Sequence, residues 1–236
     1  MVKAEIRDKV QIFIWDHNKE RVLENVEVMI DEATDDMIDG VSFHWYSGDH
    51  FDALDLVHNR FPNKVMMASE CCPLHPPVTG KLFGFTLENS KLNIHKASTV
   101  DYMDSVAYAH DMIENINHGM QRWIDWNICV NKNGGPRHVS MGFGAPVIVL
   151  DNGNYVKTPI YTTIGHIAKY IKPGAVRIAT TKCEDKIDVT AAKNSDGTIV
   201  CVLQNSGRSD RNYAIRMEGQ LIRIKVPARS IETVII

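Results

Sequence analysis

Apolar and polar residues alternate in two different ways along this chain, and the change comes near residue 150. Before it, short apolar runs alternate with segments whose apolar residues recur every three or four positions, as on one face of a helix. The apolar runs are 9–15, 41–46, 64–68 and 123–130, and the helical segments between the first three are 20–33 and 51–61. Strands that alternate with helices in this way predict parallel β/α units with right-handed crossovers.

After residue 150 the pattern becomes one of short strands. A helix is expected first, over 160–171. Strands are then expected over 175–181, 187–192, 198–204, 213–217, 221–226 and 231–236. Turn-forming residues such as Asn205-Ser206-Gly207 separate them, which is typical of an antiparallel β-sandwich. We therefore expect a β/α domain over 1–150 and a C-terminal sandwich with a linking helix over 151–236.

Polar residues suggest further boundaries. Asp49 is expected to cap a helix whose apolar stripe runs from Phe51 to Phe61. Thr99 is expected to cap a second helix, which carries Met103 and Ile113 on one side. Between the third strand and this second helix, a long polar and proline-rich loop is expected over 73–98.

Composition narrows the class of protein. The 236 residues are 44% hydrophobic and 23% charged, with a net charge of −3, which is typical of a soluble globular chain. No strongly basic face is implied, so a nucleic-acid partner is disfavoured. No apolar run approaches the roughly 18 residues of a transmembrane segment, and Met1–Lys9 lacks the apolar core of a signal peptide. Five cysteines without a CxxC pair disfavour a disulfide scaffold. The compartment stays open.

Candidate chemistry lies where the apolar runs of the β/α part end, because reactive groups of β/α barrels follow the carboxyl ends of strands. The four ends offer Asp16, His17 and Asn18; His44, Trp45 and Tyr46; Ser69, Glu70, Cys71 and Cys72; and Asp125, Trp126 and Asn127. No glycine-rich phosphate loop follows the first strand, which disfavours nucleotide binding. A carboxylate among aromatic and hydrogen-bonding groups suits sugar chemistry, and glycosidases use a pair of carboxyl groups. From the pattern alone this is one candidate among several.

Longer stretches of the sequence carry a resemblance. They are IFIWDHNKERV (12–22), DGVSFHWYSGDHFDAL (39–54), ASECC (68–72), AYAHDMIENINHGMQRWIDWNICVNKNGGP (107–136) and TIGHIAKYIKPGAVRI (163–178). The chain resembles glycoside hydrolase family 30, the family of lysosomal glucosylceramidase and microbial β-1,6-glucanases. The resemblance implies a fold of class α/β plus β: the C-terminal half of a (β/α)8 TIM barrel, strands five to eight, followed by an antiparallel β-sandwich.

The resemblance also implies roles for particular residues. Glu70 corresponds to the nucleophile after strand seven of a retaining β-glycosidase. The expected substrate-binding residues are His44, Tyr46, Trp126, Asp16 and Cys72. The acid/base glutamate of the family follows strand four and is expected upstream of Met1, since no Asn-Glu-Pro occurs here. No cofactor is implied, and the spacing of Cys71, Cys72 and His44 matches no familiar zinc pattern, so no metal is expected.

The sequence leaves the substrate and the catalytic state open. Ser140-Met141-Gly142 follows the NGGP motif where relatives often have Asn, and 73–98 does not match the family pattern. A glycan or glycolipid is the expected substrate, with glucosylceramide, β-1,6-glucan, xyloside and fucoside all open. The chain is expected to need an N-terminal half-barrel, in a longer polypeptide or a second chain, and to be nearly inactive alone. The alternative is a non-catalytic carbohydrate-binding or interaction protein, with Glu70 a surface carboxylate.

Overall fold

The computed structural model describes residues 9–75, 94–136, 138 and 142–236. The chain divides into two compact units. The β/α unit comprises Met1–Cys71 and Asn115–Trp126, and the sandwich unit comprises Cys72–Glu114 and Asn127–Ile236. None of the described helices is long and apolar enough to cross a membrane.

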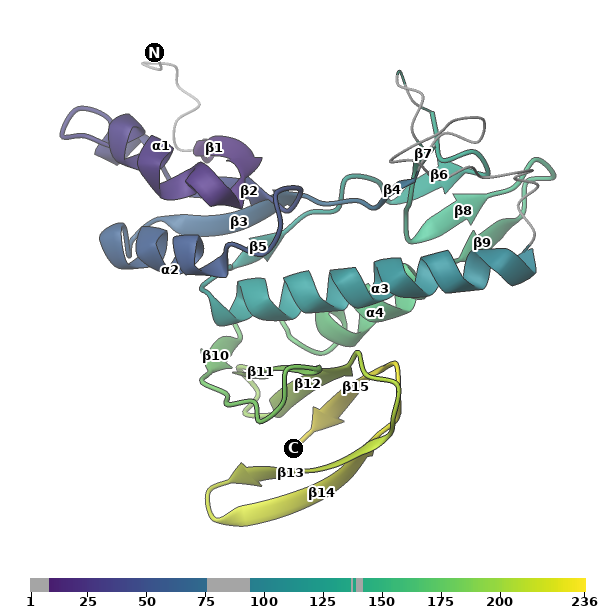
Figure 1. Ribbon diagram of the computed structural model, residues 1–236. Helices are drawn as coiled ribbons and strands as arrows, with labels where there is room; N and C mark the ends of the chain where they lie inside the picture. The colour runs from purple at the N-terminus through teal and green to yellow at the C-terminus, as the bar shows by residue number, and fades with distance from the viewer. Residues whose placement is uncertain (1–8, 76–93, 137, 139–141) are drawn as a thin grey trace. The chain divides into compact units, whose positions relative to one another are not determined.

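A parallel sheet forms the centre of the β/α unit. Its strands, in order across the sheet, are β1 (Phe13–Asn18), β2 (Gly40–His44), β3 (Val65–Glu70) and β5 (Arg122–Trp123) (Figure 1). Helix α1 (Val22–Met29) connects β1 to β2, and α2 (Phe51–Arg60) connects β2 to β3. Short 3₁₀ turns at Lys19–Arg21 (η2) and Asp35–Met37 (η3) flank α1. The predicted alternation of parallel strands and helices is confirmed.

The two faces of this sheet have different environments. On one face, Val41 and Phe43 of β2 and Met66 and Ala68 of β3 are buried. They pack against Val22 and Val26 of α1 and against Leu54 and Val57 of α2. The opposite face carries the intervening side chains. There Gly40 is required, because a Cβ at this position would lie 2.4 Å from the ring of Phe13 and 2.3 Å from a backbone oxygen.

The described residues of the sandwich unit form two helices and an antiparallel sheet. The helices are α3 (Ile94–Asn117), whose last residues belong to the β/α unit, and α4 (Pro159–Ala168). The sheet has the order β10 (Val176–Ile178), β11 (Ile187–Lys193), β12 (Ile199–Asn205) and β15 (Ser230–Ile235). A separate hairpin consists of β13 (Arg211–Met217) and β14 (Gln220–Val226). All six strands lie where the sequence predicts them.

Apolar side chains join the hairpin to the sheet. Ala191, Cys201 and Leu203 are buried, and Ile215 of β13 and Ile224 of β14 pack against them. The hairpin therefore covers one face of the four-stranded sheet, which makes the sandwich (Figure 1). Burial raises the pKa of the Cys201 thiol to about 11, so this cysteine acts as a small apolar residue of the core.

Two small sheets complete the sandwich unit. Strand β4 (Leu74–His75) pairs with β7 (Gly142–Phe143), and β8 (Val147–Val149) lies between β6 (Cys129–Asn131) and β9 (Tyr155–Lys157). The NGGP motif forms a tight loop beside β7. Gly134 has φ +72°, and a Cβ there would lie 2.6 Å from the backbone nitrogen of Phe143. No other residue type fits this position without a shift of backbone.

Several predicted boundaries are wrong. The first strand extends over 13–18 and not 9–15, and the fourth ends at Trp123, so that 129–131 belongs to another sheet. Helix α2 begins after His50, which has φ +36° and makes no side-chain cap, and not after Asp49. Helix α3 begins at Ile94, so Thr99 lies inside it. Most of the loop predicted over 73–98 lies outside the described residues.

Candidate active site

Two carboxylates flank a histidine at the carboxyl ends of three neighbouring strands. Glu70 is the last residue of β3, and its side chain is 24% exposed. His44 is the last residue of β2, and its Nε2 lies 3.9 Å from Oε2 of Glu70 and 3.2 Å from Oδ1 of Asp16. Asp16 belongs to β1 and is 66% exposed. His44 is thus placed to interact with either acid.

Irregular strand pairing produces this arrangement. The register of β1 against β2 jumps between Trp15 and His17, which leaves Asp16 as an extra residue. The register of β2 against β3 also shifts, which leaves Ser69 as an extra residue. Ser69 Oγ donates a hydrogen bond of 2.7 Å to Oδ1 of Asp16. The two extra residues therefore bind each other across β2. Trp15 and Asp16 have φ of +77° and +55°, a conformation uncommon outside glycine and often found at functional sites.

These contacts hold Asp16 in its ionised form. The hydrogen bond from Ser69 lowers the pKa of Asp16, partial burial opposes this shift, and the hydrogen bond and charge of His44 lower the pKa further. The net result is a pKa below the ordinary value. Asp16 is therefore a hydrogen-bond acceptor at neutral and mildly acidic pH.

A cavity of about 410 Å³ opens on the face of the sheet opposite to α1 and α2. Its lining residues are Phe13, Asp16, Ser42, Met67, Ser69, Glu70, Ile124, Asp125 and Trp126. Trp126 is 49% exposed, so part of its ring is available to a ligand. Carboxylates, hydroxyls and an accessible indole in one cavity are groups that bind sugar hydroxyls and stack on pyranose rings.

Aromatic rings surround His44. The ring of Tyr46 meets it edge-on, with 6.0 Å between the ring centroids, and the ring of His17 stacks on it at 6.3 Å. The backbone nitrogen of Tyr46 donates to Oδ1 of Asn18 at 3.1 Å, which ties the segment after β2 to the end of β1. Tyr46 and His17 therefore limit the movement of the imidazole of His44.

A second cluster of charged residues lies in the sandwich unit. In the described part of the chain, His110, Glu114 and Asp188 form a group with the spacing of metal ligands. Lys182 Nζ lies 2.9 Å from Glu114 Oε1 and 3.2 Å from Asp188 Oδ1, and His110 Nδ1 lies 2.8 Å from Asp188 Oδ2. The ammonium group of Lys182 already provides a positive charge, so the cluster is an ion-pair network between α3 and β11.

Comparison with known families decides the classification. Residues 2–171 match the glycosyl hydrolase family 30 TIM-barrel domain, and residues 174–234 match the glycosyl hydrolase family 30 β-sandwich domain. The chain belongs to glycosyl hydrolase family 30. The predicted fold class is confirmed: part of a TIM barrel is followed by an antiparallel β-sandwich.

Relatives of this family 30 chain include glucosylceramidases and solved structures. Mouse lysosomal acid glucosylceramidase is 27% identical over 188 residues, which is 78% of this chain and 34% of the mouse protein. The structure of SrfJ from Salmonella typhimurium is 27% identical, has a TM-score of 0.83, and is matched over 97% of this chain and 47% of its own. An endo-β-1,6-glucanase with 22% identity shares the fold, with a TM-score of 0.71 over 95% of this chain and 48% of its own. The chain thus spans about a third of the curated relative and about half of each solved structure.

The structure assembles most of the predicted site of the family 30 chain. Asp16, Glu70 and Trp126 line one cavity, and His44 contacts both carboxylates. The ring of Tyr46 adjoins His44. Cys72 is buried, at 2% exposure, and is the first residue of the sandwich unit.

Ser69 was not among the predicted binding residues. Strict strand alternation places adjacent residues on opposite faces of a sheet, so Ser69 and Glu70 are not expected in one cavity. The bulge in β3 brings both there. The residue types at these positions carry no signal for that bulge.

Proposed function

We propose that this family 30 chain carries the nucleophile of a retaining β-glycosidase, and that the nucleophile is Glu70. One observation carries the proposal. Glu70 lies at the carboxyl end of a parallel strand, in one cavity with Asp16 and Trp126 and 3.9 Å from His44. Active sites of β/α barrels lie at this end of the strands.

In the proposed reaction Glu70 attacks the anomeric carbon of a β-glycoside. The bond from that carbon to the leaving oxygen breaks as the new ester bond forms, and a carboxylic acid protonates the leaving oxygen. The same group then takes a proton from water, which attacks the glycosyl ester and releases Glu70. The imidazole of His44, 3.9 Å from Oε2 of Glu70, is placed to keep this carboxylate in position for the attack.

Other residues of the cavity are assigned to substrate binding. The exposed ring of Trp126 stacks on the apolar face of the sugar, and ionised Asp16 accepts hydrogen bonds from its hydroxyls. The family pattern also gives Tyr46 and Cys72 a place near the sugar; neither lines the cavity, where Tyr46 adjoins His44 and Cys72 is buried. The similarity to lysosomal acid glucosylceramidase favours a β-glucoside carried by a glycan or a glycolipid.

The proposal requires a second carboxyl group from the N-terminal half of the barrel. In retaining enzymes the two carboxyl groups lie about 5–5.5 Å apart. Without the general acid, catalysis falls by about 10²–10⁴-fold, and an incomplete pocket adds a loss through misplacement of the sugar. We therefore expect the isolated chain to have little activity on unactivated glycosides.

The test is assembly with an N-terminal half-barrel that carries the acid/base glutamate. The assembled protein is expected to hydrolyse an aryl β-glucoside, and Glu70→Gln is expected to lower this activity by about 10³-fold or more. Glu32→Gln changes an exposed carboxylate in the segment between α1 and β2 and serves as the matched control. A fluorinated glycoside that slows breakdown of the intermediate should label Glu70, as detected by peptide mass spectrometry.

Two results would contradict the proposal in different ways. Full activity of Glu70→Gln would exclude Glu70 as the nucleophile. An assembled protein that binds a glucoside, but neither hydrolyses it nor becomes labelled, would favour the non-catalytic carbohydrate-binding function.

A further inference from the structure

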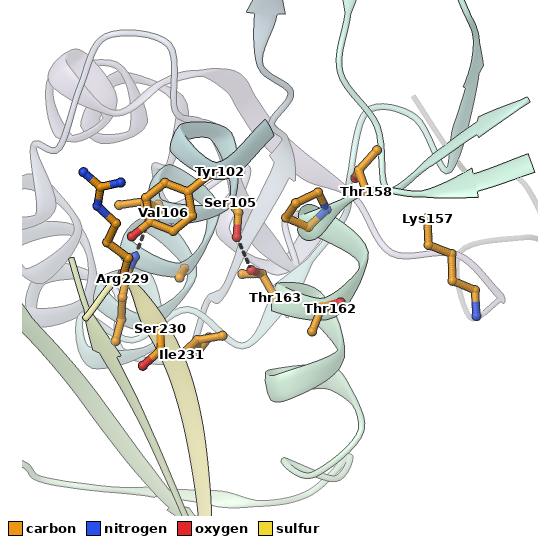
Figure 2. A pocket seen from close by; sticks show the side chains of 13 residues that line it. Tyr102, Ser105, Val106, Lys157, Thr158, Thr162, Thr163, Arg229, Ser230 and Ile231 are labelled. Carbon is orange, nitrogen blue, oxygen red and sulfur yellow. Dashed lines mark hydrogen bonds between the residues drawn. The ribbon is translucent and has the colours of Figure 1, made fainter. Parts of the chain in front are cut away.

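The sandwich unit contains a cavity that shares no residue with the one around Glu70. Its volume is about 410 Å³, which is within the range of small-molecule sites. The lining comes from α3, from the start of α4, from β12 and from the segment that enters β15 (Figure 2). Its lining includes the polar residues Tyr102, Ser105, Thr163, Gln204, Arg229 and Ser230.

The charge of this cavity is positive. Among the described residues, two cations line it, Arg229 and Lys157, and no carboxylate does. Lys157 lies at the other end of the cavity from Arg229, and its Nζ lies 4.4 Å from the ring centroid of Tyr161 (Figure 2). Arg229 has no carboxylate partner in the described part of the chain, and its guanidinium lies 5.6 Å from the ring centroid of Tyr102. Either cation is therefore available to an anion, and Arg229 is the one beside the buried hydroxyl of Tyr102.

The backbone at Arg229 is held in an unusual conformation. Its φ is +54°, in the left-handed region that non-glycine residues seldom adopt. The nitrogen of Arg229 donates to the carbonyl of Gly207 at 3.1 Å, and Ser230 Oγ donates to the carbonyl of Pro227 at 2.9 Å. These bonds fix the turn that presents Arg229, and such local strain is frequent at ligand sites.

Gln204, which lines the same cavity, has a buried amide oxygen with no hydrogen-bond partner among the described residues. Gln204 is 2% exposed, and its Nε2 donates to the carbonyl of Val106 at 3.0 Å. This bond fixes the orientation of the amide, because a rotated amide would set two carbonyl oxygens against each other. Oε1 of Gln204 and the buried hydroxyl oxygen of Tyr102 have no hydrogen-bond partner among the described residues. Buried polar atoms are nearly always satisfied, so these two indicate a missing hydrogen-bond partner, which for Gln204 Oε1 must be a donor.

We propose that this cavity binds a small polyhydroxylated anion, a monosaccharide that carries a phosphate or a carboxylate. The guanidinium of Arg229 binds the anionic group through paired N–H donors. Hydroxyls of the sugar donate to Gln204 Oε1 and Tyr102. They also exchange hydrogen bonds with Ser105 and Thr163, whose hydroxyls are 2.7 Å apart (Figure 2).

This inference does not rest on Glu70 or on glycoside hydrolysis. Its lining residues all belong to the sandwich unit, so binding is measured with the 236-residue chain and without a substrate of the enzyme. A negative result here leaves the proposed nucleophile unaffected, and inactivity of the assembled barrel leaves this site unaffected.

The test is titration calorimetry of the full chain with glucose 6-phosphate, glucuronate, inorganic phosphate and glucose. One of the two charged sugars is expected to bind at least tenfold more tightly than glucose and inorganic phosphate, because it alone satisfies both Arg229 and the uncharged acceptors. Tighter binding of glucose 6-phosphate would identify a phosphate ligand, and tighter binding of glucuronate a carboxylate ligand. Arg229→Ala is expected to weaken this binding by at least tenfold.

Arg223→Ala removes an exposed arginine of β14 and is the matched control, with unchanged binding expected. Arg229→Gln is a second variant, for use if Arg229→Ala lowers the melting temperature. The proposal is overturned if glucose binds as tightly as both charged sugars, if the Arg229 variants bind like the wild type while folded, or if no probe binds at millimolar concentration.

Discussion

The two main sheets of the molecule differ in the regularity of their strand pairing. In the sandwich, β11 and β12 pair over seven consecutive residues without a break, from Ile187↔Asn205 to Lys193↔Ile199. In the β/α unit, both long ladders shift by one residue near their carboxyl ends. The regular ladder keeps strict alternation along its length, whereas the shifted ladders direct Asp16, Ser69 and Glu70 to one cavity. Bulges therefore mark where a sheet has been adapted to present side chains.

Substitutions in the cores of the two units are expected to have the largest effects on stability. Leu54→Ala in the β/α unit and Leu203→Ala in the sandwich each remove a buried side chain, at a cost of about 2–5 kcal/mol. All four tryptophans lie in the β/α unit, so their fluorescence reports on that unit alone, while circular dichroism reports on both. Leu54→Ala is expected to lower the urea concentration at which half of the fluorescence change has occurred. Leu203→Ala is expected to lower only the urea concentration at the midpoint of the circular dichroism change. Equal shifts of the fluorescence midpoint would mean that the units unfold together.

Two histidines provide the next test. His44 lies between Asp16 and Glu70, whereas His166 bonds Thr233 at 2.9 Å in the sandwich unit, where burial lowers its pKa. In the assembled enzyme, His44→Ala is expected to lower kcat/KM by about 10²-fold, because the carboxylates lose a positioning partner. His166→Ala is expected to leave kcat/KM within about twofold at a temperature where it remains folded. Similar losses of kcat/KM in both variants would show that His44 has no special role in the candidate active site.

Disruption of the ion-pair network of His110, Glu114, Lys182 and Asp188 is expected to change stability less than the core substitutions do. Burial raises the pKa of Asp188, but the hydrogen bonds and charges of His110 and Lys182 outweigh it and hold the pKa below its ordinary value. The stability that Asp188 contributes is therefore present above its unfolded pKa and is lost as the pH falls through the folded pKa. Lys182→Met is expected to lower the free energy of unfolding by about 1 kcal/mol at pH 7, since Lys182 is partly exposed. Because Lys182 lowers the pKa of Asp188, the substitution should also make the acid-induced loss of stability begin at a higher pH.

The measurement is the urea midpoint by circular dichroism between pH 7 and pH 3. Lys193→Met, at an exposed position of β11, is the control and should follow the wild type. An unchanged pH profile in Lys182→Met would show that His110 alone holds the pKa of Asp188 low.

The smallest expected effect concerns the bond between the two bulges. Ser69→Ala removes the hydrogen bond that contributes most to the lowered pKa of Asp16, so this pKa should rise toward its ordinary value. Because Asp16 is largely exposed, little change in stability is expected. The measurement is a titration of the Asp16 carboxyl carbon by NMR, with Ser206→Ala in the sandwich as control. A pKa of Asp16 that stays low in Ser69→Ala would assign the shift to His44.

The sandwich was predictable to within a few residues because turn-forming residues such as those at 194–197 bound each strand. The boundaries of the strands in the β/α unit were less predictable. Asp16-His17-Asn18 is polar and suggests a loop, yet His17 and Asn18 pair with Phe43 and His44. The apolar run 123–130 suggests one strand, but pairing with β3 ends at Trp123. Which residues pair depends on partners far away in the chain, which local composition does not specify.

The candidate site was predictable in its members more than in its geometry. Glu70, His44 and Asp16 follow from the family resemblance, and the structure brings these three side chains together. The contact from Ser69 to Asp16 was not predictable, because it depends on an extra residue in each of two ladders. The cavity around Arg229 was not predicted either, because its lining comes from four separate segments without a shared motif.

The two bulges also constrain how these strands can change length in evolution or design. Successive side chains of a strand point to opposite faces of the sheet, so the face on which a residue lies depends on whether an odd or an even number of residues separates it from a reference position. Each bulge adds one to that number. Loss of the bulge in β3 at constant length would bring Glu70 onto the side where α1 and α2 pack, whereas deletion of Ser69 would leave Glu70 opposite His44 and on the cavity side. Insertions in the loops of this protein leave the alternation of β3 intact, whereas pairing of Ser69 with His44 in the place of Glu70 would reverse the direction of the proposed nucleophile.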